Sequence, residues 1–192
     1  MMSKSSEPGK AIRPSLLTSK QATAAAIYGG LGFATRALGL VIPIVPPLLF
    51  DTRAIWLPIG AMIAGPWGLP IICLLHDIPS GVFLPGIAFS LARGYFFVAF
   101  YKPIYHMRSY TIQCLALIPV WAIANFLGDI MIVGGMALYG IVPFWPFLTL
   151  WYAGGGSEAY GIASYLTTIL MLKYAKDYVK PAWTWRPWRA QA

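Results

Sequence analysis

The sequence predicts an all-α integral membrane protein, and its composition, its apolar segmentation and its charge distribution are the three observations behind this prediction. Of 192 residues, 58% are hydrophobic and only 10% are charged, whereas a soluble domain carries about 25% charged residues. Apolar stretches recur along the chain between short loops rich in proline, glycine and charge. We expect six membrane segments in one domain, 21–180, between a basic cytoplasmic tail, 1–20, and a Trp/Arg-rich interfacial tail, 181–192.

The segment 50–81 organises the expected fold. Two short apolar stretches, 54–64 and 69–75, are separated by the turn sequence GPWG. The first stretch would be only about 16 Å long as a helix, against roughly 30 Å of hydrocarbon. The pattern therefore predicts a short helical hairpin, 54–75, that begins and ends on one side of the membrane. A full crossing and a re-entrant loop both fit this pattern.

The remaining apolar segments predict longer helices at 22–42, 83–101, 110–139 and 159–176. The third of these would be about 45 Å long if wholly helical. It must therefore tilt, project or break, and Gly134-Gly135 is the expected break. The stretch 141–156 is rich in aromatic residues and glycine, which is typical of a membrane interface.

The distribution of charge predicts the topology. All lysines and arginines except Arg36, Arg53 and Arg93 fall in the N-terminal tail, the 102–109 loop or the chain from Lys173 onward. Positive charge accumulates on the cytoplasmic side of membrane proteins, so we expect these regions, and both termini, in the cytoplasm of a cell (plasma or inner) membrane. The acidic groups fall toward the outer side: Asp51, Asp77, Asp129 and Glu158.

Polar residues in the outer halves of the helices form the candidate substrate-binding site, because charge within a membrane helix is costly and indicates function. Trp121, Asn125 and Asp129 recur every four residues and share one helix face. With Arg36 and Glu158 they are expected to line an outward-facing pocket, in which arginine would clamp a carboxylate or phosphate. The alternative, compatible with the first, is a structural ion pair between Arg36 and Asp129.

Nothing in the sequence indicates catalysis, a cofactor or a metal. The HExxH, GxSxG and Walker phosphate-loop motifs are absent, so no enzyme is expected. His76, expected at the outer interface, and His106 lie at opposite sides, and Cys73 and Cys114 lack CxxC spacing. Arg93, near mid-membrane, is expected to be structural.

Small residues recur every four positions on the first span, at Ala22, Ala26, Gly30 and Ala34. Such a ladder leaves a smooth groove along one helix face, where a second helix can approach closely. Internal packing and a face for a separate partner subunit both fit the ladder.

These features together resemble the substrate-binding S component of energy-coupling factor (ECF) transporters, which are six-helix membrane proteins of about this size with cytoplasmic termini. Three features carry the resemblance: the AxxxA step from Ala22 to Ala26, the proline-rich connector before FDTRAIWLPIGAMIAGPWG, and a last helix that ends in a basic tail. The aromatic stretch 141–152 and the tryptophan-rich tail depart from the family pattern.

The resemblance implies capture of a vitamin or similar micronutrient from outside. The small-residue ladder would dock on a transmembrane coupling subunit driven by cytosolic ATPases, the five candidate residues would bind substrate, and the connector 43–53 would act as a lid. Besides substrate, lipid and these subunits, no nucleic acid partner is expected. Two other interpretations stay open: a non-catalytic assembly subunit of a larger membrane complex, and a small channel or secondary transporter.

Overall fold

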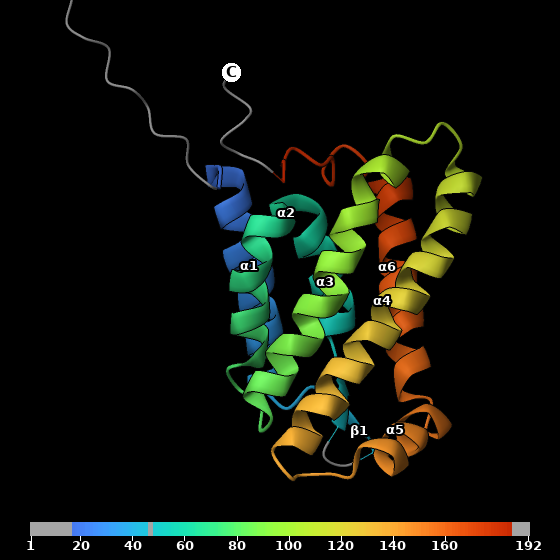
Figure 1. The fold of residues 1–192 in the computed structure, drawn as a ribbon. Coiled ribbons are helices and arrows are strands. Elements are labelled where there is room, and N and C mark those ends of the chain that lie inside the picture. The colour runs from blue at the N-terminus through green and yellow to red at the C-terminus, as the bar shows by residue number, and fades with distance from the viewer. Residues whose placement is uncertain (1–16, 46–47, 186–192) are drawn as a thin grey trace, which may run out of the picture.

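The structure, a computed structural model, describes residues 17–45 and 48–185. Its long helices lie side by side in a bundle (Figure 1). The elements in chain order are α1 (Ser19–Ala37), β1 (Val41–Val45), β2 (Leu48–Asp51), α2 (Arg53–Asp77), α3 (Phe83–Tyr105), α4 (Tyr110–Leu138), α5 (Phe144–Ala153) and α6 (Gly156–Tyr174). The prediction of a mainly helical protein is confirmed, with one addition: β1 and β2 pair antiparallel in the predicted connector.

α2 is a helical hairpin. Its 25 residues would extend about 37 Å in a straight helix, yet its first residue, Arg53, forms an ion pair with its last, Asp77. The chain reverses at Gly65, where φ is +67° and ψ is −163°, a conformation essentially restricted to glycine. The shape predicted for 54–75 is therefore present, and each arm is only about 18 Å long.

The indole of Trp183 covers the turn of this hairpin. Its Nε1 donates to the carbonyl oxygen of Met62 at 2.9 Å, and the residue is 2% exposed. A Cβ at Gly65 would collide with the ring. In the predicted interfacial tail, Trp183 thus packs on the protein, while residues 186–192 lie outside the described residues.

Among residues 17–45 and 48–185, three helices are long and apolar enough to cross a membrane: α2, α3 and α4. The 25 residues of α2 are divided between the two arms of the hairpin, so neither arm alone is long enough to cross a membrane. α1 and α6 have 19 residues each. The structure therefore bears out a helical protein with apolar helices of membrane-spanning length, while six crossings stay a prediction.

The two ends of the bundle differ in charge. At the end where α1 begins and α6 ends (top of Figure 1), Lys20 and Lys102 donate to backbone carbonyls of the segment after α6, each at 3.5 Å. The opposite end holds the β1–β2 hairpin, α5 and the carboxylates of Asp51 and Asp77. The predicted segregation of basic and acidic groups is present in the fold.

α4 runs unbroken for 29 residues, so the predicted break at Gly134-Gly135 is wrong. A Cβ at Gly135 would lie 3.0 Å from Cβ of Pro85, and this glycine therefore permits close packing of α4 on α3. α4 runs obliquely across the bundle (Figure 1), which accommodates its length. The aromatic stretch 141–156 contains a further short helix, α5, that the sequence pattern did not predict.

Candidate functional site

Four charged side chains form an ion-pair cluster near the β1–β2 hairpin: Arg36, Asp51, Arg53 and Asp77. Arg53 Nε donates to Asp51 Oδ1 at 2.8 Å, and Arg36 Nη1 donates to Asp51 Oδ2 at 3.0 Å. Asp77 pairs with both arginines, and no side chain of the cluster is more than 8% exposed. Two positive and two negative charges offset one another, which reduces the cost of burying them. The cluster joins α1 and β2 to both ends of α2.

The predicted ion pair between Arg36 and Asp129 is wrong. Arg36 pairs with Asp51 and Asp77 instead. The cause is the β-hairpin: Val41 lies opposite Asp51, so the connector brings a carboxylate back to the end of α1. The sequence predicted helices joined by open loops, and in that arrangement Asp51 was not expected beside Arg36.

Asp51 keeps its charge within the ion-pair cluster. Burial raises the pKa of its carboxyl, but the attraction and hydrogen bonds of Arg53, with the nearby charge of Arg36, outweigh burial and hold this pKa below its ordinary value. The backbone N–H of Asp51 also donates to Tyr160 Oη at 3.1 Å. The β-hairpin is therefore attached to α6 as well as to α1 and α2.

Asp129 lies in a separate cage of neutral donors. Its Oδ1 accepts from Trp151 Nε1 at 2.9 Å, and its Oδ2 accepts from Tyr152 Oη at 3.0 Å and from Ser157 Oγ at 2.5 Å. Within the described ranges 17–45 and 48–185, no basic side chain forms an ion pair with it. The aromatic stretch 141–156 thus supplies partners for a buried carboxylate.

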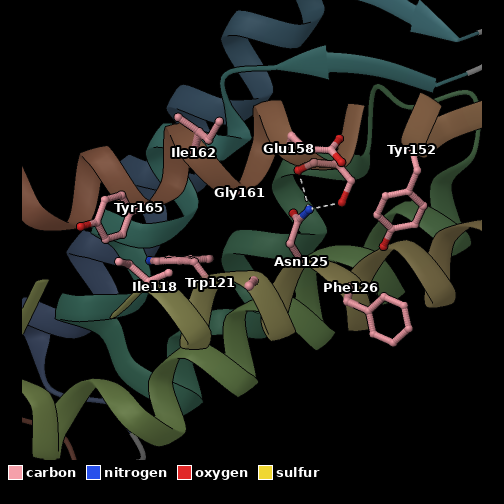
Figure 2. Close-up of a pocket in the computed structure, with 11 residues that line it drawn as sticks. Ile118, Trp121, Asn125, Phe126, Tyr152, Glu158, Gly161, Ile162 and Tyr165 are labelled. Atoms are coloured by element: carbon pink, nitrogen blue, oxygen red, sulfur yellow. Dashed lines mark hydrogen bonds between the residues drawn. The ribbon is translucent and has the colours of Figure 1, made fainter. Parts of the chain in front are cut away.

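A pocket of about 490 Å³ lies between α4 and α6 (Figure 2). Most of its wall is apolar or aromatic, as in typical small-molecule sites. Polar groups gather at one end, and they come from α4, α5 and α6: Asn125, Tyr152, Ser157 and Glu158. This arrangement suits a small ligand with an apolar body and a polar edge.

Asn125 is the polar residue most deeply set in this pocket. Its Nδ2 donates to the carbonyl oxygen and to Oγ of Ser157, at 2.5 and 2.6 Å (dashed in Figure 2). Its Oδ1 has no hydrogen-bond partner within the described part of the chain, although the residue is 3% exposed. An unsatisfied buried acceptor costs about 1–3 kcal/mol, so this oxygen favours a ligand that donates a hydrogen bond.

Trp121 forms a rigid part of the pocket wall. Its ring stacks on Phe97 with 4.5 Å between centroids, and its Nε1 donates to Thr168 Oγ1 at 3.0 Å. Both contacts hold the indole in one orientation. The indole is therefore a fixed part of the pocket wall, and it is 2% exposed.

Four of the five predicted substrate residues lie together. Trp121, Asn125 and Glu158 line the pocket, and Asp129 stands behind Asn125, with 3.5 Å between Nδ2 and Oδ2. Arg36 lies in the ion-pair cluster instead. The sequence pattern did not predict Tyr152 and Ser157 as pocket residues. The aromatic stretch before Glu158 was the feature of the sequence that could have indicated them.

Arg93 is fully buried between α3, α4 and α6. Its Nη2 donates to Ser164 Oγ at 2.9 Å and to the carbonyl oxygen of Tyr160 at 3.3 Å. Rings of Phe89, Trp121 and Tyr160 surround the guanidinium, 4.8 to 5.7 Å from its Cζ. Its Nε and Nη1 have no hydrogen-bond partner among the residues that the structure describes.

The small-residue ladder of α1 faces outward. Ala22, Ala26 and Ala34 are exposed, and a Cβ at Gly30 would meet nothing within 4 Å. The opposite face of α1 packs on α2, where Gly32 lies against His76. Internal packing of the ladder is therefore excluded within the described chain.

His76 is buried between α1 and α2, which corrects the expected interfacial position. Its Nε2 lies 2.9 Å from the carbonyl oxygen of Tyr28, to which it donates. Within residues 17–45 and 48–185, no group of three or more His, Cys, Asp or Glu side chains is placed to hold a metal ion.

The structure is that of an apolar helical bundle in which α2 is folded into a hairpin. Basic and acidic groups lie at opposite ends of the bundle, and a pocket of small-molecule size lies between α4 and α6. Comparisons with known protein families, curated proteins and solved structures find no match for this chain. A functional conclusion therefore depends on the geometry of the site.

Proposed function

We propose that this protein is a membrane-embedded capture subunit that binds a vitamin or similar small micronutrient in the α4–α6 pocket and docks on an ATP-driven coupling module. One observation carries the proposal: a pocket of about 490 Å³ ends in the buried, unpartnered Oδ1 of Asn125. An apolar pocket with a few convergent polar groups is the usual form of a small-molecule site.

The outward surface of the bundle supports embedding in a membrane. Large apolar side chains are exposed along α3, α4 and α6, among them Leu84, Ile112, Leu115 and Leu170. A soluble monomer rarely exposes such extended apolar surface. With three helices of spanning length, a lipid environment explains this surface, and the basic end would face the cytoplasm.

The outward ladder of α1 supports docking on a second membrane protein. Because its positions carry hydrogen or methyl side chains, a partner helix can approach the α1 backbone closely. The same face would also suit permanent assembly in a larger complex, which is the second candidate function. The two candidates differ in whether the isolated protein binds a solute.

The test is the solute that the isolated protein retains. Purified protein is denatured, and mass spectrometry identifies any small molecule released. Ala122 lines the pocket, so the indole of an Ala122→Trp variant would occupy the pocket, and this variant should lose the molecule. Ile123→Trp is the matched control, because Ile123 is exposed on the same turn of α4 and does not line the pocket.

Two results would overturn the capture proposal. One is folded wild-type protein that releases no small molecule. The other is retention by Ala122→Trp equal to that of Ile123→Trp. A protein stable only with other membrane chains, and without a bound solute, would favour the assembly function.

A further inference from the structure

The side-chain donors at the polar end of the pocket are already used within the protein. The amide nitrogen of Asn125 donates to the carbonyl oxygen and to Oγ of Ser157. The hydroxyl groups of Ser157 and Tyr152 donate to the Asp129 carboxylate, at 2.5 and 3.0 Å. A hydroxyl carries one hydrogen and an amide nitrogen carries two, so these three pocket residues keep no side-chain donor for a ligand.

The polar side-chain atoms that remain at this end are acceptors. Asn125 Oδ1 has no hydrogen-bond partner within residues 17–45 and 48–185, and the residue is 3% exposed. In Figure 2 this oxygen lies on the side of the amide away from the Ser157 hydroxyl. A flipped amide would bring it against the carbonyl oxygen of Ser157, where Nδ2 now lies, so the present orientation is favoured. A ligand at this end must therefore donate a hydrogen bond.

The polar end of the pocket also carries negative charge. Glu158 lines it, and no lysine or arginine is among the described residues of its wall. Behind the wall, Asp129 adjoins Asn125 and Arg93 packs against Trp121, and their opposite charges offset each other. Glu158, in the first turn of α6, also offsets the positive end of the helix dipole. An anionic ligand group would here meet acceptors and a like charge.

We propose that the pocket binds the protonated amine of a small molecule with an apolar body. An ammonium N–H donates to Asn125 Oδ1, and the charge of the ammonium is balanced by Glu158. The apolar body lies along the side chains of Ile118 and Ile162, which line the pocket away from its polar end. This assignment rests on the proposed function, because it names the ligand chemistry of the same pocket.

The expectation that arginine would clamp a carboxylate or phosphate required Arg36 in the pocket, and Arg36 lies in the ion-pair cluster. Other ligand groups meet only part of what the pocket offers. A neutral alcohol would satisfy Asn125 Oδ1 but would gain nothing from the charge of Glu158. A quaternary ammonium would gain from that charge but has no N–H to donate. An amine cation that carries N–H groups meets both requirements.

The test compares four probes that share a phenethyl body, on wild-type protein freed of retained solute: phenethylamine, its trimethylammonium analogue, phenethyl alcohol and phenylpropionate. At neutral pH the first is a cation with N–H groups, the second a cation without them, the third a neutral donor and the fourth an anion. Binding is measured by ligand-observed nuclear magnetic resonance. We expect phenethylamine to bind at least about tenfold more tightly than the trimethylammonium analogue or phenylpropionate, because a buried acceptor rejects an analogue that lacks the donor.

Variants then assign the two contacts. Asn125→Leu should abolish the preference for phenethylamine over its trimethylammonium analogue, because the acceptor is lost. Glu158→Gln should narrow the preference for phenethylamine over phenethyl alcohol, because only the amine gains from the charge. Asp177→Asn is the matched control: Asp177 is exposed after α6, at the opposite end of the bundle, and both preferences should persist. A general loss of structure cannot produce this split, and the comparison on wild-type protein requires no variant.

Three results would overturn the amine assignment: the trimethylammonium analogue or phenylpropionate binding as tightly as phenethylamine, no binding of phenethylamine, or a retained molecule without a protonated N–H group. In the last case, loss of that molecule from Ala122→Trp would leave the capture function standing. A retained aminolipid would support the amine assignment and contradict capture of a soluble micronutrient. Absence of any retained molecule contradicts the capture function itself, whereas the order of the four probes still decides the amine assignment.

Discussion

Gly65 and Trp183 determine the turn of α2 between them. The glycine has a positive φ of +67°, and the indole of Trp183 occupies the space that a side chain there would need. Backbone conformation and packing thus both require glycine at one position. The GPWG sequence indicated the turn, whereas the tryptophan that covers it lies more than a hundred residues away in the chain.

Gly65→Ala should strongly destabilise the protein. Strained backbone at such a position costs about 1–3 kcal/mol, and the collision with Trp183 adds to this cost. We expect a clear fall in the thermal unfolding temperature of the detergent-solubilised protein. Gly30→Ala is the control, since a Cβ there meets nothing within 4 Å. Equal stability of the two variants would contradict the packing described for the turn.

Asp51 should make the stability of the protein depend on acid pH. Its pKa is below the ordinary value in the folded protein, so its ionised form contributes stability above the unfolded-state pKa of about 3.9. This contribution is lost as the pH falls through the lower, folded pKa. Arg36, Arg53 and Asp77 are the charged groups that face it.

Asp51→Asn is the variant that tests this contribution. Removing one partner of a buried ion pair costs about 3–5 kcal/mol, so the variant should be less stable at neutral pH. Its unfolding temperature should also fall less steeply than that of wild type between neutral and acid pH. Parallel pH profiles of the two proteins would show that Asp51 does not carry this dependence.

At the scale of elements, α1 presents two faces with different tasks. One face packs on α2 through small residues such as Gly29 and Gly32. The other, the small-residue ladder, faces outward in the described chain. The repeat at every fourth position predicted a close helix contact, but the sequence contains two such faces on one helix, so it did not show which face is internal.

Ala26→Trp should preserve folding and solute binding and should abolish co-purification with a coupling partner. The bulky ring would hold a second helix away from the α1 backbone. Ala99→Trp is the matched control, because Ala99 is exposed on α3 and lies outside the ladder. Loss of folding in Ala26→Trp alone, or unchanged co-purification, would contradict a docking role for this face.

The β1–β2 hairpin is the element that changed the predicted site most. The connector 43–53 was expected as a lid, and its pairing in strands carries Asp51 to Arg36. Proline at positions 43, 46 and 47 argued against a regular strand, so the sequence did not predict this reversal. Because the hairpin pairs Arg36 with Asp51, Arg36 lies in the ion-pair cluster and not in the pocket to which it was assigned.

At the scale of the whole molecule, local signals predicted more than distant contacts. The apolar segments and the GPWG turn predicted α1, α3, α4, α6 and the hairpin of α2, but not α5. The charge pattern predicted the basic and acidic ends. The spacing of Trp121, Asn125 and Asp129 predicted one helix face, and that face contains three neighbouring residues of the site. These features depend on neighbours in the sequence.

Features that depend on packing between distant segments were not predictable in this way. The close packing of α4 on α3 depends on the fit of Gly135 against Pro85, and the role of α5 depends on Trp151 reaching Asp129. The unsatisfied groups of Arg93 and Asn125 likewise become apparent only when α3, α4 and α6 are placed together. Arg93, expected to be structural, is fully buried, bonds to Tyr160 and Ser164 of α6, and does not line the pocket.

The central claim is that a small solute binds beside Asn125, between α4 and α6. Calorimetric titration of the identified retained solute into wild type, Asn125→Leu and Arg36→Lys tests it most directly. We expect Asn125→Leu to weaken binding about tenfold or more and Arg36→Lys, in the separate ion-pair cluster, to leave the affinity unchanged. Unaltered binding by Asn125→Leu, together with loss of binding in Arg36→Lys, would contradict the account.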